Sequence, residues 1–561
     1  MSSSMYRIVS RATATLFAGG AGSGAYLYET DDGAKRSIQA YSCFCPVILH
    51  YRLVELKDKL VSAVPEEEWA ELDERYAKPT VARLGELQGM YAKYGQTAAG
   101  LTNTLGDAWV RELRTLENEI PPRSVDTVRK TIEEETNQKM EDLFSEFDSE
   151  PLGSASIGQV HRAVLKKNGQ EVAVKVQYPE AGELFTGDIH AIRKLCEWFS
   201  PEQVCTLDAL EKQNISELDY MNEANNLLEV SRNMAHHGFQ PKEVLVPQPI
   251  PELSTKRMLV MDLLPGPKLI DGMRAYYAEW AEANGTTLKR METQARQKIE
   301  EEGIPDKYDG PTANQIAIYQ RWVRIQSTLH NIGIAVYNAF LPRLKNSNIE
   351  DGNVAYTQAT TPPNTPRIVD TLMRVHGYQL LIDGLFNADP HGGNFLLLPD
   401  GRLGLIDYGS TKRLSENERI NACVMYAALA RNDKAMIWQM AKLGGYKSRH
   451  MNQDVNFLLT KFGFDSWGKE VTGGKNVQQF MDDLKRRDPW SETPDNFVLA
   501  SFMAIRIRAL TLGMNHPVTC SDWWGEIAEK ELQRMGLPYE SWDEEQLMKY
   551  RPELNIQKFD M

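Results

Sequence analysis

The length, composition and charge of the chain exclude several classes of protein. With 561 residues it exceeds one ordinary domain, so two lobes or domains with extensions are expected. Apolar residues make up 42% of the chain and charged residues 25%, which is typical of a globular rather than a disordered protein. The formal net charge of −14, without a dense stripe of Lys and Arg, argues against a nucleic-acid binder. The six cysteines follow neither a metal-ligand spacing nor a disulfide framework, which fits a reducing compartment.

The first 34 residues differ from the rest of the chain. Arg7 and Arg11 are the only charges before Glu29, and Ser and Thr are frequent. Residues 12–28 form an uncharged stretch at the short limit for crossing a bilayer. An Arg-containing, Ser-rich and acid-poor start predicts an organellar leader with a possible membrane segment, mitochondrial or, if the source has one, directed to a plastid. A flexible tail is the alternative.

Residues 35–145 are predicted to form a helical N-terminal extension. Between residues 81 and 122 apolar side chains recur at intervals of three and four, until a Pro-Pro pair ends the pattern. Lys93 and Gln96 lie three apart on one face of this helix. Gly95 beside them would let another backbone approach closely. The tetrapeptide KYGQ alone equally fits a solvated helix surface.

Strand signals begin near residue 150. Two β-rich runs, SIGQVHRAVL and EVAVKV, are joined at Asn168-Gly169, which predicts a hairpin. A small-residue loop precedes them and could lie over phosphates with its backbone N–H groups. Lys175 is the only cation in its strand, so it needs an anionic partner unless it faces water at an edge.

A partner for Lys175 is expected in the segment ISELDYMNEANNLLEV. The segment is predicted to be helical, with Glu217, Asp219 and Glu223 in its middle. Asp219 and Glu223 would share a helix face, where like charges disfavour an isolated helix. Lys175 and a second cation would neutralise the cluster, and solvent exposure is the alternative.

The segment ADPHGGNFLLLPDGRLGLIDYGS, residues 388–410, gathers polar residues around a small predicted hairpin. A helix is expected to lead into Asp389, with Asn394 five residues later and Asp407 at the end of the hairpin. Phosphoryl transfer from a nucleotide needs such a set, because one carboxylate positions or deprotonates the acceptor while an amide and a second carboxylate hold Mg²⁺. A strand Lys that orients the phosphates, paired with a helix Glu, completes it.

Six motifs together give the chain a resemblance to the UbiB/aarF-domain family of atypical kinases: KYGQ, SASIGQVHRA, VAVKVQYP, ELDYMNEANN, NADPHGGN and LIDYGS. The leader and the large insert resemble the mitochondrial subgroup nearest aarF-domain-containing kinase one. The resemblance implies an α+β, protein-kinase-like two-lobed fold with a small β-rich N-lobe, a helical C-lobe and an added helical KxGQ segment. The implied domains are a leader at 1–34, an extension at 35–145, an N-lobe at 146–266, and a C-lobe at 267–561 with an insert around 278–365.

The resemblance also implies roles for the candidate residues. Lys93, Gly95 and Gln96 would belong to a regulatory segment over the cleft, in contact with the ExD pair Glu217 and Asp219. Catalysis would use Asp389, Lys175 and Glu223, and Mg²⁺ would be bound by Asn394 and Asp407. The residues implied to bind the nucleotide, ATP or ADP, are Gly153, Ser154, Ala155, Ser156, Ile157, Gly158, Lys175 and Met261.

Three features depart from the family pattern: one loop and two single residues. The family's loop is usually Ala-rich, whereas this chain has Gly-Ser-Ala-Ser at 153–156, which makes a nucleotide preference tied to that loop less secure. Asn387 stands where the family frequently has His, and Tyr408 where it frequently has Phe. All of the metal and nucleotide groups are present, which disfavours an inactive pseudokinase.

The expected acceptor is not an ordinary protein substrate. Only a few residues separate Asp407-Tyr408-Gly409 from Ser415, which begins a capping box, and no Ala-Pro-Glu follows. ATP hydrolysis or a small, lipid-like or isoprenoid acceptor fits better, and the family's association with coenzyme Q and membrane lipid homeostasis implies membrane association. The alternatives are a small-molecule kinase of the choline or aminoglycoside type and a scaffold that binds nucleotide without turnover. The small-molecule kinases lack KxGQ and the ELDY cluster.

Overall fold

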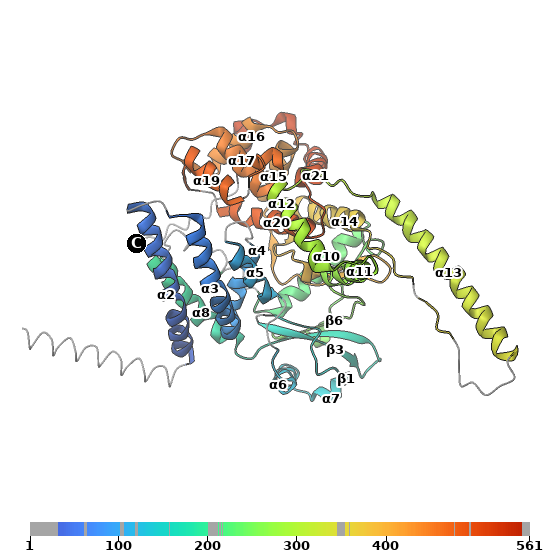
Figure 1. Cartoon of the computed structure of the whole chain (residues 1–561). Helices are drawn as coiled ribbons and strands as arrows, with labels where there is room; N and C mark the ends of the chain where they lie inside the picture. Colours follow the sequence, from blue (N-terminus) through green and yellow to red (C-terminus); the bar gives the residue numbers. More distant parts are fainter. Residues whose placement is uncertain are drawn as a thin grey trace, which may run out of the picture. The chain divides into compact units, whose positions relative to one another are not determined.

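The chain forms two compact units in the computed structural model (Figure 1). Unit 1 contains residues 1–225 and 248–263, and unit 2 contains residues 226–247 and 264–561. The predicted leader lies almost wholly outside the described residues. None of the described helices has the length and apolar character that crossing a bilayer requires. The residues that the structure describes are 32–60, 64–100, 106–117, 122–155, 157–199, 211, 215, 217–344, 354–357, 359–475, 477–492 and 495–551.

Unit 1 contains an antiparallel sheet and a group of helices. The sheet has the order β1-β3-β4-β6, with β2 paired to β3. Asn168 and Gly169 connect β3 to β4, so the predicted hairpin is confirmed, and Gly169 has the positive φ of 72° that its turn requires. The strands are β1 Phe144–Phe147, β2 Gly153–Ser154, β3 Gly158–Leu165, β4 Glu171–Gln177 and β6 Met258–Asp262.

The helices of unit 1 flank this sheet in the sequence. They are α2 Asp32–Leu60, α3 Glu66–Leu87, α4 Gly89–Gly100, α5 Asp107–Leu113, η1 Arg114–Glu117, α6 Val125–Thr136, α7 Met140–Leu143, α8 Ala181–Phe199 and η3 Pro251–Leu253. α2 packs beside α3 and α8, as Figure 1 also shows. α6 packs on the sheet, because Val128 and Ile132 join the buried valines of β4 in one apolar core.

The described part of residues 81–122 is helical as expected, but it is broken into several helices. α3 ends at Leu87 and α4 begins at Gly89, with Gln88 between them at a φ of 53°. A Cβ on Gly89 would lie 2.8 Å from a carboxylate oxygen of Asp188, a contact that the sequence pattern cannot reveal. Periodicity therefore predicted the helical character but not the break.

Unit 2 is mostly helical. α10 Tyr220–His236 begins in unit 1 and continues into unit 2. The other helices are α11 Leu269–Ala283, α12 Leu288–Glu302, α13 Ala313–Leu344, α14 Thr365–Tyr378, η4 Gln379–Asp383, η5 Gly392–Asn394, α15 Glu416–Ala430, α16 Lys434–Leu443, α17 Gln453–Phe464, α18 Lys469–Thr472, α19 Val477–Arg487, α20 Asp495–Gly513, α21 Cys520–Arg534, η6 Tyr539–Ser541 and α22 Glu544–Lys549.

Three small sheets accompany these helices. β5 Val244–Leu245 pairs in parallel with β9 Leu403–Leu405, which pairs in antiparallel with β8 Phe395–Leu397. β7 Leu385–Asn387 pairs with β10 Thr411–Arg413, and β11 Lys447–Ser448 pairs with β12 Trp490–Glu492. The capping box predicted at Ser415 is confirmed, because its side chain accepts from Glu418 N–H and the Glu418 carboxylate accepts from Ser415 N–H.

Candidate functional site

Lys175 and Glu223 form a largely buried ion pair in unit 1. Nζ of Lys175 lies 2.8 and 2.9 Å from the two carboxylate oxygens of Glu223. Lys175 comes from the middle of β4 and Glu223 from the first turn of α10, with side-chain exposures of 13% and 3%. A buried Lys carries a desolvation cost unless an anion compensates it, and Glu223 supplies that anion. The expected pairing is therefore present.

The small-residue loop before β3 is a tight turn. Gly153 and Ser154 pair with Val160 and Gln159, and Ala155 N–H donates to Gly158 O at 2.8 Å. Ser156 lies outside the described residues. Gly158 has no space for a side chain, since a Cβ would lie 2.4 Å from the Tyr220 hydroxyl and 2.6 Å from the carbonyl oxygen of Val176. The turn therefore needs glycine at its end whatever ligand it meets.

Lys93 pairs with Glu217. Its Nζ lies 2.8 Å from Glu217 Oε2, and the side chains are 17% and 11% exposed. Lys93 therefore does not point to bulk solvent. Oε1 of Glu217 has no hydrogen-bond partner among the described residues, so one oxygen of this buried carboxylate is left for another donor.

Asp219 lies at the N-terminal end of α10 and not in the middle of a helix. The prediction of a helix with Glu217 and Asp219 in its middle is wrong, because α10 begins at Tyr220. Asp219 Oδ1 instead accepts from the backbone N–H of Met221 at 3.0 Å, in the manner of an N-cap. The helix starts here because the Asp219 carboxylate accepts from a backbone N–H of the first turn that has no partner within the helix. Asp219 therefore lies before the helix, and the expected repulsion between Asp219 and Glu223 on one helix face does not arise.

Gly95 and Gln96 complete the KxGQ segment on α4. A Cβ on Gly95 would lie 2.5 Å from Leu116 Cδ1 and 3.4 Å from Leu84 Cδ1. The close approach is thus to leucine side chains, and the expected approach of another backbone is wrong. The side chain of Gln96 lies outside the described residues.

Asp188 anchors the N-terminus of α4, which the sequence analysis missed. Its carboxylate forms two hydrogen bonds with Arg36, at 3.0 and 2.8 Å, and accepts from Met90 N–H at 3.2 Å. Burial raises the pKa of Asp188, while Arg36 acts in the opposite direction. An acidic residue among the apolar positions of α8 was the available signal.

The second group of predicted site residues lies in unit 2, around the β8–β9 hairpin. Asn394 directly precedes β8, and its backbone C=O accepts from Ile406 N–H at 3.1 Å. Asp407 directly follows Ile406, so the register places Asn394 and Asp407 at the open end of the same hairpin. Asp407 Oδ1 accepts from Gly409 N–H at 3.0 Å. The sequence-predicted hairpin is confirmed.

Asp389 is held from three directions. Its backbone C=O accepts from Asn394 Nδ2 at 2.8 Å, and its backbone N–H donates to Asn387 Oδ1 at 2.7 Å. Its carboxylate pairs with Arg506 of α20. The prediction that a helix leads directly into Asp389 is wrong, because a π-helical turn, η4, and the strand β7 lie between. Two arginines, at 506 and 508, within the otherwise apolar α20 were the signal for Arg506.

Asn387 connects the two carboxylate-bearing segments. Besides accepting from Asp389 N–H, it donates from Nδ2 to the backbone oxygen of Asp407 at 2.9 Å. Asn387 is only 3% exposed. The departure from the family's frequent His therefore retains a donor and an acceptor at this position. Tyr408 is buried, and its hydroxyl accepts from Gln379 at 2.7 Å.

The donor set of the hairpin fits Mg²⁺. Mg²⁺ prefers oxygen ligands and is usually bound by one or two carboxylates together with substrate phosphates. The amide nitrogen of Asn394 is used by Asp389 O, which leaves the amide oxygen as the remaining ligand atom beside the Asp407 carboxylate. No group of three or more His, Cys, Asp and Glu side chains suited to a metal occurs among the described residues, so a dedicated all-protein metal cage is absent from that part.

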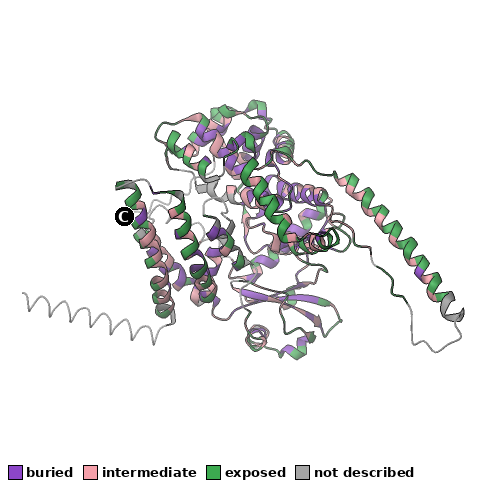
Figure 2. Ribbon diagram, viewed as in Figure 1, coloured by how far each residue is buried: buried purple, intermediate pink, exposed green. Residues whose placement is uncertain are grey.

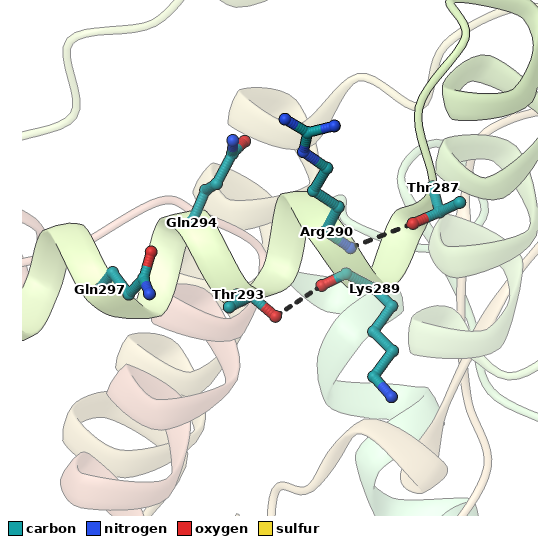
Figure 3. Close-up of a pocket in the computed structure, with 6 residues that line it drawn as sticks. All are labelled: Thr287, Lys289, Arg290, Thr293, Gln294 and Gln297. Carbon is teal, nitrogen blue, oxygen red and sulfur yellow. Dashed lines mark hydrogen bonds between the residues drawn. The ribbon is translucent and has the colours of Figure 1, made fainter.

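Met261, which the resemblance assigns to nucleotide binding, lies in the sheet of unit 1. Met261 is 5% exposed on β6, opposite Ala173 of β4. A shallow hollow on α12, shown in Figure 3, contains none of the predicted site residues. Thr287 caps this helix by accepting from Arg290 N–H, and the hollow is lined by Thr287, Lys289, Arg290, Thr293, Gln294 and Gln297.

The ABC1 atypical kinase-like domain matches residues 115–302 and 349–441 of the chain. The chain belongs to this family. Its sheet-containing unit 1 and mostly helical unit 2 have the α+β, two-lobed, kinase-like character of the family, which confirms the predicted family and fold class.

Individual relatives share only part of their length with the chain. AarF domain-containing protein kinase 1 of Mus musculus is 34% identical over 275 residues, 46% of this chain and 50% of the relative. Probable protein kinase UbiB of Vibrio atlanticus is 30% identical over 37% of this chain and 38% of the relative. Protein ACTIVITY OF BC1 COMPLEX KINASE 8, chloroplastic, of Arabidopsis thaliana is 33% identical over 35% of this chain and 26% of the relative. The matched stretches thus span half or less of these relatives.

A solved structure also resembles the chain. It is that of Rv3197 from Mycobacterium tuberculosis in complex with erythromycin, with 22% identity and a TM-score of 0.38, covering 80% of this chain and 95% of that protein.

Proposed function

We propose that the chain is an atypical kinase or ATPase that binds a Mg²⁺-nucleotide. The observation that carries the proposal is the largely buried Lys175–Glu223 pair, at 2.8 Å. A phosphate-orienting Lys held by a helix Glu is one half of the phosphoryl-transfer apparatus, and the Asn394–Asp407 hairpin supplies ligands for the other half. The family assignment supports the same reading.

Each residue is given a limited task. Lys175 orients the phosphates, and Glu223 keeps the ammonium group in place. Asn394 and Asp407 hold Mg²⁺, which when bound neutralises charge on the phosphates. Asp389, fixed by Asn387, Asn394 and Arg506, positions the acceptor and receives its proton. The turn at 153–158 and Met261 contact the nucleotide.

The acceptor is proposed to be water or a small, lipid-like molecule. β10 and the capping box of α15 follow Asp407 closely, and α15 already begins at Glu416. This short connection leaves little chain for the long segment on which protein kinases bind peptide substrates. The names of several relatives include the words protein kinase. Phosphorylation of peptides is therefore the alternative activity that experiments must exclude.

Lys93 is proposed to control nucleotide use through its pair with Glu217. An ammonium group held by a buried carboxylate is fixed in position and can act on the phosphates or on the loop beside them. Asp219, Gly95 and Gln96 belong to the same proposed regulatory set, together with the helix anchor at Asp188.

The proposed cellular setting is an organelle membrane. The Arg-containing, acid-poor start of the chain supports a leader at residues 1–34, and one relative from Arabidopsis is named chloroplastic. A mitochondrial inner membrane is proposed, with a role in membrane lipid or coenzyme Q homeostasis, supported by the relative named UbiB.

Turnover measurements test the proposed reaction. Purified full-length protein with Mg²⁺ and ATP should release ADP, and Asp407→Asn should lower the turnover at least tenfold because it removes a metal-ligand charge. Asp400→Asn is the matched control, since Asp400 lies exposed at the tip of the same hairpin. Tight nucleotide binding without any turnover would favour the scaffold alternative. Phosphate transfer to peptides at the rate of ATP loss would contradict the proposed acceptor class.

Lys93→Ala tests the proposed regulatory role. The variant should change the ratio of ATP to ADP affinity or raise autophosphorylation, because the Lys93–Glu217 pair is lost. Lys57→Ala is the control, since it removes an exposed ion pair with Glu68 in the same unit. If both variants show the parent's nucleotide affinities and autophosphorylation, Lys93 has no part in nucleotide use.

A further inference from the structure

α13 is largely exposed, as the green residues along it in Figure 2 show, and many of its exposed residues are large and apolar. Ile318 and Leu329 are 66% and 63% exposed, and Trp322 is 52% exposed. Soluble proteins rarely leave such a patch uncovered without a partner. The apolar face consists of Ile318, Tyr319, Trp322, Ile325, Leu329, Ile332, Val336 and Tyr337.

The opposite side of α13 is already covered by the chain itself. Asn331 exchanges hydrogen bonds with both the N–H and the C=O of Thr357, at 2.9 and 2.8 Å. Asn338 does the same with Val354, at 2.9 Å each. Nearer the N-terminus of α13, Gln320 donates to the backbone oxygen of Pro362 in the returning segment. The returning segment therefore lies along the side of the helix that carries Gln320, Asn331 and Asn338, and it leaves the exposed apolar face uncovered.

The charge of this region is opposite to that of the protein. The whole chain carries a net charge of −14, yet the sequence contains no Asp or Glu between Asp309 and Glu350. The same stretch contains basic residues, of which Arg321 and Arg324 lie on described turns of α13. An apolar, aromatic-rich helix face whose neighbouring charged side chains are arginines, with no acidic residue, has the chemistry that binds anionic lipid at a membrane interface.

We propose that the apolar face of α13 docks on an anionic membrane surface. In this proposal the helix lies in the plane of the membrane interface, with its apolar face toward the acyl chains. Trp322, Tyr319 and Tyr337 match the amphipathic aromatic residues that are enriched at the headgroup level. This docking surface contains none of the predicted site residues and does not depend on the proposed kinase reaction.

A second copy of the chain is the competing occupant. Without Tyr319, the members of the face from residue 318 to residue 336 alternate steps of four and three, which also suits a coiled-coil seam: Ile318, Trp322, Ile325, Leu329, Ile332 and Val336. Two such helices would bring arginines together without any acidic residue to pair with them, whereas anionic lipid supplies the missing charge. Tyr319 and Tyr337 also widen the apolar face beyond the narrow seam that a coiled coil buries.

Quenching of Trp322 fluorescence by brominated lipid tests the proposal at the helix itself. Full-length protein is mixed with brominated phosphatidylcholine vesicles that contain phosphatidylserine, and the quenched emission is compared with that of Trp322→Phe. The parent should show a quenched component that Trp322→Phe lacks, whatever other segment touches the membrane. Omitting phosphatidylserine or raising the salt concentration should weaken the association roughly tenfold. Equal quenching in both proteins would overturn the proposal.

A matched pair of variants distinguishes the loss of the apolar face from the effect of added negative charge alone. Ile325→Glu/Leu329→Glu should reduce the quenching to the level of Trp322→Phe. Gln294→Glu/Gln297→Glu adds the same charge to exposed α12 and should keep the quenching of the parent. Unchanged melting temperatures confirm that both variants fold. Retained quenching in Ile325→Glu/Leu329→Glu would contradict the proposal, as would a dimer in sedimentation experiments that this variant abolishes.

Discussion

At the scale of single residues, polar side chains outside the predicted catalytic and metal-binding set hold the candidate site residues in position by hydrogen bonds. Asn387 uses both ends of its amide, one toward Asp389 and one toward Asp407. Asn387 is buried, so removing its hydrogen bonds leaves backbone groups unsatisfied and releases two segments at once. Such outer residues determine how accurately carboxylates are placed.

Asn387→Leu should lower ATP turnover about 10- to 100-fold and raise the Mg²⁺ concentration needed for half-maximal rate, with little effect on unfolding outside unit 2. The change removes a donor and an acceptor while keeping a similar volume. Asn387→His, the residue frequent in the family, should retain more activity. Steady-state rates against Mg²⁺ concentration are the measurement, and equal Mg²⁺ dependence in the parent and the Leu variant would refute the positioning role.

At the scale of elements, α4 depends on a contact far away in the sequence. Asp188 of α8 binds Arg36 of α2 and the first turn of α4, so one carboxylate fixes the helix that carries Lys93. Hairpins and the capping box were predictable because their signals are local. The break at Gln88 was not, since it requires a partner about 100 residues further along the chain.

Asp188→Asn should destabilise unit 1 by about 2 kcal/mol, because it leaves Arg36 without its bidentate anion in a largely buried place. The midpoint of urea unfolding is the measurement, followed through signals from unit 1. Arg111→Gln, which removes an exposed pair with Glu74, should leave the midpoint unchanged. If the two variants have the same midpoint, Asp188 does not anchor α4.

At the scale of the whole molecule, the predicted residues fall into two groups, one in each unit. Local motifs and the family resemblance identified both groups. The spacing of residues around a hairpin and a single Lys in a strand can both be recognised in the sequence alone. The supporting contacts of Arg506, Asn387 and Asp188 were not predictable, since they depend on how helices and strands pack.

Acid should destabilise the protein through His376. Its ring is buried beside Phe395, which follows Asn394, and burial lowers the pKa of His376 to about 4. The unfolded chain binds a proton near pH 6.5, so the stability from neutral His376 is present above 6.5 and is lost as the pH falls toward 4. The loss reaches about 3 kcal/mol.

Urea midpoints measured from pH 7 to pH 4 test this expectation. The parent should lose more stability with falling pH than His376→Leu, because the variant has no ring to protonate at that position. The difference between the two curves isolates His376 from the carboxylates that also titrate in this range. Parallel curves would show that His376 does not contribute.

The ion pair between Asp389 and Arg506 joins a motif to a helix more than 100 residues further along the chain. A premature stop codon placed between residues 442 and 505 would leave every family motif named above, and the matched domain, intact. The shortened product would nevertheless lack the guanidinium that pairs with the Asp389 carboxylate. Alleles truncated between residues 442 and 505 should therefore lose the proposed reaction, even though a motif search would still score them as complete.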